Sequence, residues 1–126
     1  MFDDDDPVLA HVRELARSFP DAEEKVSHGR PAFFTKKVFA YYGASVRDDG
    51  DWVQHPAAIV VVPDPDDRPA LLEDPRVFVP AYLGAYGWLG VDLDTDADWD
   101  EVRELLDASY RLTAPKRSIA RLDQDA

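Results

Sequence analysis

The chain has 126 residues, 45% of them apolar, and its 26 acids against 14 Lys and Arg give a net charge of −12. A chain of this length fits one domain spanning residues 1–126. The negative total repels nucleic acid and anionic lipid at long range, and the lack of cysteine excludes a disulfide framework or a thiolate metal site.

The sequence shows no targeting or membrane segment. Met1 to Asp6 lack the basic start and apolar stretch of a signal peptide. The longest apolar run, Ala57 to Val62, falls far short of the ~20 residues that cross a bilayer. We therefore expect a cytoplasmic protein without a membrane partner. The oligomeric state stays open, with a monomer favoured.

Amphipathic helices are predicted near both ends of the chain. Asp6-Pro7 is typical of a helix start, and apolar residues then recur at helical spacing as far as Phe19. Asp98 begins the second helix, with Glu101 at the spacing of a capping box. Ala114-Pro115 ends it, and we expect a basic tail to follow.

The middle of the chain is rich in β-branched and aromatic residues, which predicts strands. Lys36-Lys37 is expected at a hairpin tip, Asp48 to Asp51 in a turn and Tyr82 to Gly87 in a loop. Strands between terminal helices predict an α+β fold, in which an antiparallel sheet carries the N- and C-terminal helices on one face. The expected strands are 25–28, 32–34, 38–45, 57–62, 77–79 and 88–93, with a short helix over 65–73.

Three motifs occur in series along most of the chain. They are Ser27-His28-Gly29-Arg30-Pro31-Ala32-Phe33 with Lys37-Val38-Phe39-Ala40, Tyr82-Leu83-Gly84 with Gly87-Trp88-Leu89-Gly90-Val91, and Ser109-Tyr110-Arg111-Leu112 with Ala114-Pro115-Lys116-Arg117. In this order they resemble the MmcQ/YjbR family of small bacterial proteins, over about residues 8–117. The resemblance implies a fold similar to that of CyaY and frataxin and carries the label "DNA-binding". It implies no catalytic residues.

The bases are distributed unevenly. Lys25 to Arg47 contain five bases and no acid, and Ala108 to Leu122 contain four bases and no acid. If these segments share a surface, it can dock phosphates; alternatively, the bases are scattered and pair with neighbouring acids. The candidate residues for binding an anion or nucleic acid are His28, Arg30, Lys36, Lys37, Tyr82, Trp88, Lys116 and Arg117.

The aromatic residues near these bases have two interpretations. Tyr82 and Trp88, with His28 and Phe33, can stack bases or line a small-molecule pocket. Alternatively Phe33, Trp88 and Tyr110 belong to the core, with the Tyr110 hydroxyl donating to backbone. His28 titrates near neutral pH, but a lone His beside a Gly-Arg-Pro turn is typical of an oriented hydrogen-bonding residue.

The acids suggest a second function. Frataxin-like folds are associated with an acidic ridge that binds iron weakly, and clustered carboxylates suit hard cations. The alternative is that these acids cap a helix and keep the protein soluble. The acidic set on or near the first helix is Asp3 to Asp6, Glu14, Asp21, Glu23 and Glu24.

No metal site or cofactor is assigned. The alternating acids from Asp92 to Asp100 fail the register of a calcium loop, because Ala97 stands where Gly is needed. Gly-rich phosphate loops, GxSxG and HExxH are absent from the sequence. We therefore expect a non-catalytic binding module for an anionic partner such as DNA, or alternatively a frataxin-like metal-binding or protein-partner module.

Overall fold

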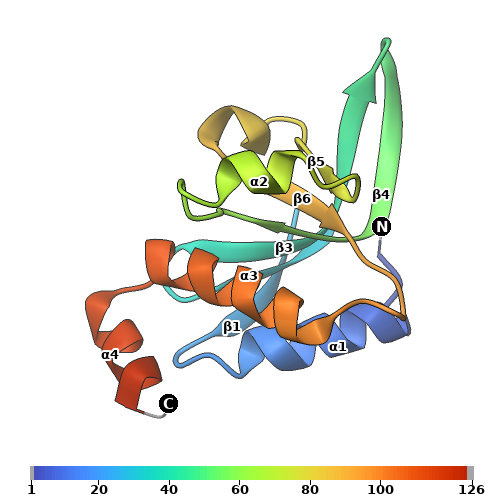
Figure 1. Ribbon diagram of the computed structural model, residues 1–126. Helices are drawn as coiled ribbons and strands as arrows, with labels where there is room; N and C mark the ends of the chain where they lie inside the picture. Colours follow the sequence, from blue (N-terminus) through green and yellow to red (C-terminus); the bar gives the residue numbers. More distant parts are fainter. Residues whose placement is uncertain (1, 125–126) are drawn as a thin grey trace.

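A six-stranded antiparallel sheet forms the middle of the molecule (Figure 1). The computed structural model describes residues 2–124, and its strands are ordered β1-β2-β3-β4-β6-β5. They are β1 (Glu23–Ser27), β2 (Arg30–Phe34), β3 (Val38–Asp48), β4 (Asp51–Val61), β5 (Val77–Phe78) and β6 (Leu89–Asp92). The helices are α1 (Pro7–Arg17), α2 (Arg68–Leu72), α3 (Trp99–Thr113) and α4 (Lys116–Gln124), with a 3-10 turn η1 (Leu83–Tyr86). The predicted α+β architecture is confirmed.

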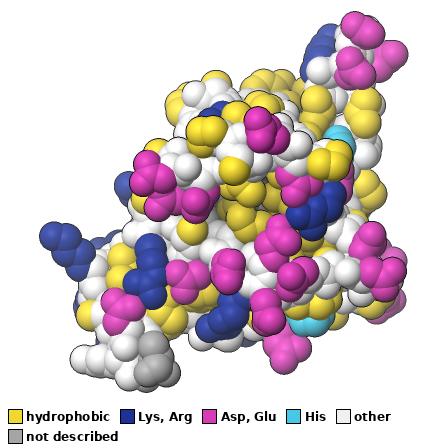
Figure 2. Space-filling model, viewed as in Figure 1, with side chains coloured by type: hydrophobic (Ala, Val, Ile, Leu, Met, Phe, Trp, Pro, Cys, Tyr) yellow, Lys and Arg dark blue, Asp and Glu magenta, His cyan; other side chains and the backbone are white. Residues whose placement is uncertain are grey.

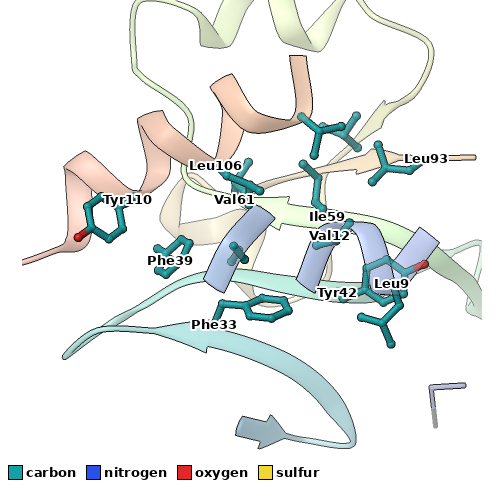
Figure 3. Close-up of a cluster of buried hydrophobic side chains, with 14 of the residues drawn as sticks. Leu9, Val12, Phe33, Phe39, Tyr42, Ile59, Val61, Leu93, Leu106 and Tyr110 are labelled. Atoms are coloured by element: carbon teal, nitrogen blue, oxygen red, sulfur yellow. The ribbon is translucent and has the colours of Figure 1, made fainter. Parts of the chain in front are cut away.

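α1 and α3 pack against the same face of the sheet and enclose the core (Figures 1 and 3). Leu9 and Val12 point from α1, and Leu106 from α3, toward Phe33 and Ile59 of the strands; all five are fully buried. Burying each such side chain contributes about 1.5–3 kcal/mol. This apolar layer fixes α1 and α3 relative to the sheet.

The start of each main helix has a defined cap. Asp6 accepts a hydrogen bond from the Val8 N–H through Oδ1 (2.9 Å), and its Oδ2 accepts the Tyr42 hydroxyl (2.6 Å). Asp98 caps α3 as predicted, accepting from the N–H of residue 100 and of Glu101. The Glu101 carboxylate does not complete a capping box, because it accepts from Arg76 Nη2 instead (2.8 Å).

The β3–β4 hairpin is longer than predicted and projects from the sheet (Figure 1). Asp49 and Gly50 both have positive φ, as a type I′ turn requires, so the predicted turn is confirmed. The expected strands were too short because the first residues of β4, from Asp51 to Gln54, are exposed and carry no buried stripe. Backbone pairing rather than apolar alternation extends this hairpin.

The chain after Pro115 forms a helix, α4, where a basic tail was expected. Ile119 and Leu122 pack against the core cluster, and Ser118 is buried with its hydroxyl donating to Asp21 Oδ2 (2.7 Å). These tertiary contacts stabilise a helix that is too short to be stable alone. No helix within residues 2–124 is long and apolar enough to span a membrane.

Candidate anion-binding sites

Five of the eight candidate residues line two separate depressions near opposite ends of β2. His28, Arg30 and Tyr82 line one depression, whereas Lys36 and Arg117 line another. At ~3.3 Å per extended residue, Arg30 and Phe34 at the two ends of β2 lie roughly 13 Å apart, and Lys36 lies beyond Phe34 in the turn. The structure therefore divides the candidates into two sites.

The first site is a basic cluster, which we define as Lys36, Lys37, Lys116 and Arg117. Lys36 lies at the tip of the β2–β3 hairpin, which the Thr35 N–H closes by donating to the Lys37 carbonyl (3.2 Å). Lys116 and Arg117 begin α4. All four side chains are exposed, and none of them takes part in an ion pair within residues 2–124.

Lys36 and Arg117 line one depression of about 470 Å³ although they are remote in sequence. The carboxylates Asp21 and Glu23 also line it. Arg121 Nη1 forms an ion pair with Asp21 Oδ1 (2.6 Å). Among the residues that line the depression, Glu23 is then the one remaining carboxylate near Lys36 and Arg117. The Ser118 and Ile119 N–H groups donate to the Pro115 carbonyl, whereas the N–H groups of Lys116 and Arg117 have no intrahelical acceptor and add the positive end of the helix dipole. The depression therefore combines free cations with unpaired amide donors.

Buried contacts hold the two halves of the basic cluster together. The Ser109 hydroxyl of α3 donates to the Phe39 carbonyl (2.5 Å) and accepts from the Val62 N–H (3.0 Å). The Tyr110 hydroxyl donates to the Pro20 carbonyl (2.7 Å), as the sequence predicted. These bonds fix α3 against β3, which follows the hairpin tip, and α3 leads into α4, which carries Lys116.

The second site, which we call the Arg30 pocket, lies on the side of the sheet away from α1 and α3. It is a depression of about 540 Å³ between the sheet and the loop before η1. Tyr41 and Val60 form the sheet wall. Further lining residues are Ser27, His28, Arg30, Gly43, Ala44, Ser45, Pro80, Ala81, Tyr82 and Leu83.

Arg30 is half-buried in this pocket without a carboxylate partner among the described residues. Its Nη2 donates to Gln54 Oε1 (2.9 Å). Burial lowers the pKa of the Arg30 guanidinium, since desolvation disfavours the charged form. Four other arginines form ion pairs; they are Arg13, Arg76, Arg111 and Arg121.

Comparison with known proteins places the chain in a family. The model of the YjbR family matches residues 17–112. The chain belongs to the YjbR family. The resemblance drawn from the three motifs is therefore confirmed.

A solved structure supports the fold. The crystal structure of the Deinococcus radiodurans protein DR2400, with the family-model domain DUF419, is similar with a TM-score of 0.61 and 20% identity. The similarity covers 86% of this chain and 79% of that one. No curated protein sequence matches this YjbR chain.

The aromatic candidates of this YjbR protein take different places. Phe33 and Tyr110 are fully buried among the helix-side core residues. Trp88 is half-buried and packs on Tyr41 with 5.6 Å between ring centroids, behind the Arg30 pocket. Tyr82 is 80% exposed at the pocket rim. Of these four candidate rings in the described chain, Tyr82 is the one that lines the Arg30 pocket.

His28 has a structural role in a turn. It has a φ of 51° and precedes Gly29 with a φ of 78°, as in a two-residue type I′ turn between β1 and β2. His is among the non-glycine residues that tolerate this conformation. The turn leaves the imidazole exposed on the rim of the Arg30 pocket.

The acidic set near α1 is largely engaged with bases and backbone. Arg13 Nε contacts Glu24 Oε1 (2.7 Å) and its Nη2 contacts Asp4 Oδ1 (3.1 Å), across a depression of about 620 Å³ between α1 and β1. These contacts raise the pKa of Arg13, chiefly through the Glu24 hydrogen bond. In the described chain, no group of three or more His, Asp or Glu side chains is arranged to hold a metal ion.

Acids dominate the face formed by α1 and α3. Figure 2 shows them spread over this face, with single cations between them. Such a surface repels a polyanion. This face is therefore unfavourable for binding an anionic partner.

Proposed function

We propose that this YjbR protein is a non-catalytic binding module that holds an anionic partner, double-stranded DNA, at the basic cluster. The observation that supports this most is the shared depression of Lys36 and Arg117, two unpaired cations from distant parts of the chain. Each cation that neutralises a phosphate releases condensed counterions and so favours binding. The first amides of α4 supply hydrogen bonds for a phosphate in the same depression.

The negative body of the protein limits the strength of this interaction. With a net charge of −12, long-range repulsion opposes approach of the duplex, so binding requires low salt and local contacts. The projecting β3–β4 hairpin is unsuited to the backbone of DNA, because its tip carries Asp48, Asp49 and Asp51. The edge that carries the basic cluster is therefore the proposed contact surface.

The test is duplex binding measured by fluorescence anisotropy across a salt series. With four phosphate contacts, we expect log affinity to fall against log salt with a slope of about −4. The double variant Lys36→Glu/Arg117→Glu should bind about tenfold or more weakly at low salt and show a slope of about −2, since two contacts are lost.

The matched control is Arg17→Glu/Arg47→Glu. It changes the net charge by the same amount at two exposed bases outside the basic cluster that form no ion pair within residues 2–124. We expect it to retain most of the affinity. Equal losses in both variants would show that only total charge matters, and absence of binding at low salt would remove DNA as the partner.

A further inference from the structure

We propose that the Arg30 pocket is a second binding site, for a small molecule that joins one anionic group, carboxylate or phosphate, to a planar apolar ring. The site is separate from the basic cluster and faces the other side of the sheet. Its volume of about 540 Å³ lies within the ~300–1,000 Å³ typical of small-molecule pockets. Its walls are mostly apolar, with a few polar groups that can orient a ligand.

The anionic group is assigned from Arg30. Its guanidinium is partly removed from water and is bonded on one arm by Gln54, which is neutral. Partial burial weakens the solvation of this cation, and an anion bound by its remaining N–H groups would offset that loss. Carboxylate and phosphate oxygens match the fork geometry of arginine.

Gly43 allows the guanidinium to approach the backbone of β3 within the pocket lining. A Cβ built on Gly43 would stand 2.5 Å from Arg30 Nη1, and its φ of +84° disfavours any L side chain. The pairing of β3 with β4 shifts register between Tyr42 and Ala44, at the same point. The bulge and the glycine together hold the charged end of Arg30 against the backbone of the sheet.

The planar ring is assigned from the aromatic residues and from the strained turn at the mouth. Tyr82 has φ 63° and ψ −59°, and the Leu83 N–H donates to the Ala81 carbonyl (2.7 Å), which defines a classic γ-turn. This turn is rare and strained, and such strain occurs mainly at ligand-binding and active sites. It is anchored by the Ala81 N–H, which donates to the Ser45 carbonyl of β3 (3.0 Å).

The turn places an exposed aromatic ring at the rim of the pocket that Tyr41 also lines. Tyr82 is 80% exposed, and its ring lies 6.3 Å from that of Trp52. Tyr41 is supported from behind by Trp88. A planar ligand between Tyr82 and the sheet would contact aromatic and aliphatic surface on both sides while its anionic group reached Arg30.

The experiment titrates the whole chain with four probes by calorimetry and by amide NMR. They are 2-naphthoate, 2-naphthyl phosphate, the neutral 2-naphthamide and inorganic phosphate. We expect one or both naphthyl anions to bind, shifting the amide signals of residues 41–45 and 81–83; the stronger anion identifies the natural anionic group. 2-Naphthamide lacks the anionic group and inorganic phosphate lacks the ring, so each of these probes should bind about tenfold or more weakly than the naphthyl anions.

Two variants with the same charge change separate the pocket from the surface. Arg30→Gln should weaken naphthyl anion binding about tenfold or more and leave the amide unchanged, whereas Arg17→Gln on α1 should leave all probes unchanged. The double variant Lys36→Glu/Arg117→Glu should also leave the binding of all four probes unchanged. A failure of the Arg30 pocket proposal is therefore distinguishable from a failure of the DNA proposal. Absence of binding by both naphthyl anions at millimolar concentration, or shifts outside the Arg30 pocket, would overturn the proposal. If Arg30→Gln does not fold, the amide shifts of the native chain still test the proposal, because they show whether the naphthyl anions bind inside or outside the Arg30 pocket.

Discussion

Replacing Phe39 with Ala should lower the free energy of unfolding by about 3–5 kcal/mol, as expected for a large aromatic residue removed from a packed core. Phe39 is fully buried. Its ring centroid lies 5.4 Å from that of Tyr110 and 6.0 Å from that of Phe19, and these two rings lie 5.0 Å apart. The substitution empties the centre of this aromatic group, which joins the start of β3 to α3. A domain stabilised by about 5–15 kcal/mol would lose a large part of its stability.

Urea unfolding followed by circular dichroism measures this loss. Tyr86→Ala serves as the control, because Tyr86 is 80% exposed, and its removal should change stability by less than about 0.5 kcal/mol. Phe39→Leu keeps most of the volume and should lose less than Phe39→Ala, so it remains measurable if the alanine variant does not fold. A loss below about 1 kcal/mol for Phe39→Ala would contradict the described core.

Replacing Ser109 with Ala should lower the free energy of unfolding by about 2–3 kcal/mol, because the buried Phe39 carbonyl and the partly buried Val62 N–H each lose a hydrogen-bond partner. The Ser109 side chain is completely buried between α3 and the sheet. Its hydroxyl donates to the Phe39 carbonyl and accepts from the Val62 N–H. Neither residue belongs to the paired register between β3 and β4. Alanine leaves both groups without a hydrogen bond.

Ser18→Ala is the matched control for Ser109→Ala. Ser18 is exposed at the end of α1, and its hydroxyl donates to the Leu15 carbonyl (2.6 Å), where water can replace it. The expected change in the control is within about 0.5 kcal/mol. Equal stability losses in the two variants would show that the Ser109 bridge does not join α3 to the sheet as described. Because this bridge also positions the β2–β3 hairpin, Ser109→Ala should weaken duplex binding as well.

Much of the fold could be predicted because local patterns and tertiary structure agree. Asp6-Pro7 marks the start of α1, and Asp98 marks that of α3. α4 was missed because its stability comes from distant contacts, such as the bond between Ser118 and Asp21, which no local pattern reveals. The long β3–β4 hairpin was underestimated for a related reason, since its outer half is exposed and held by backbone pairing.

The candidate sites could be predicted only in part. The two acid-free segments contain the residues that meet at the basic cluster, Lys36 and Arg117. Arg30 and Lys36 lie in different sites because the extended strand β2 begins at Arg30 and ends before Lys36. The predicted strand began only at Ala32, so the sequence did not indicate this separation. Gly43 and Gln54 were missed because they reach Arg30 through strand register rather than sequence proximity.

The most direct test of the proposed function is an amide NMR map of a short DNA duplex titrated into the isotope-labelled chain at low salt. The account predicts that the largest amide shifts fall at residues 35–37 and 116–118, on two segments that are remote in sequence and adjacent in the fold. Shifts confined to one of these segments, or centred on the projecting hairpin around residues 46–53, would contradict it.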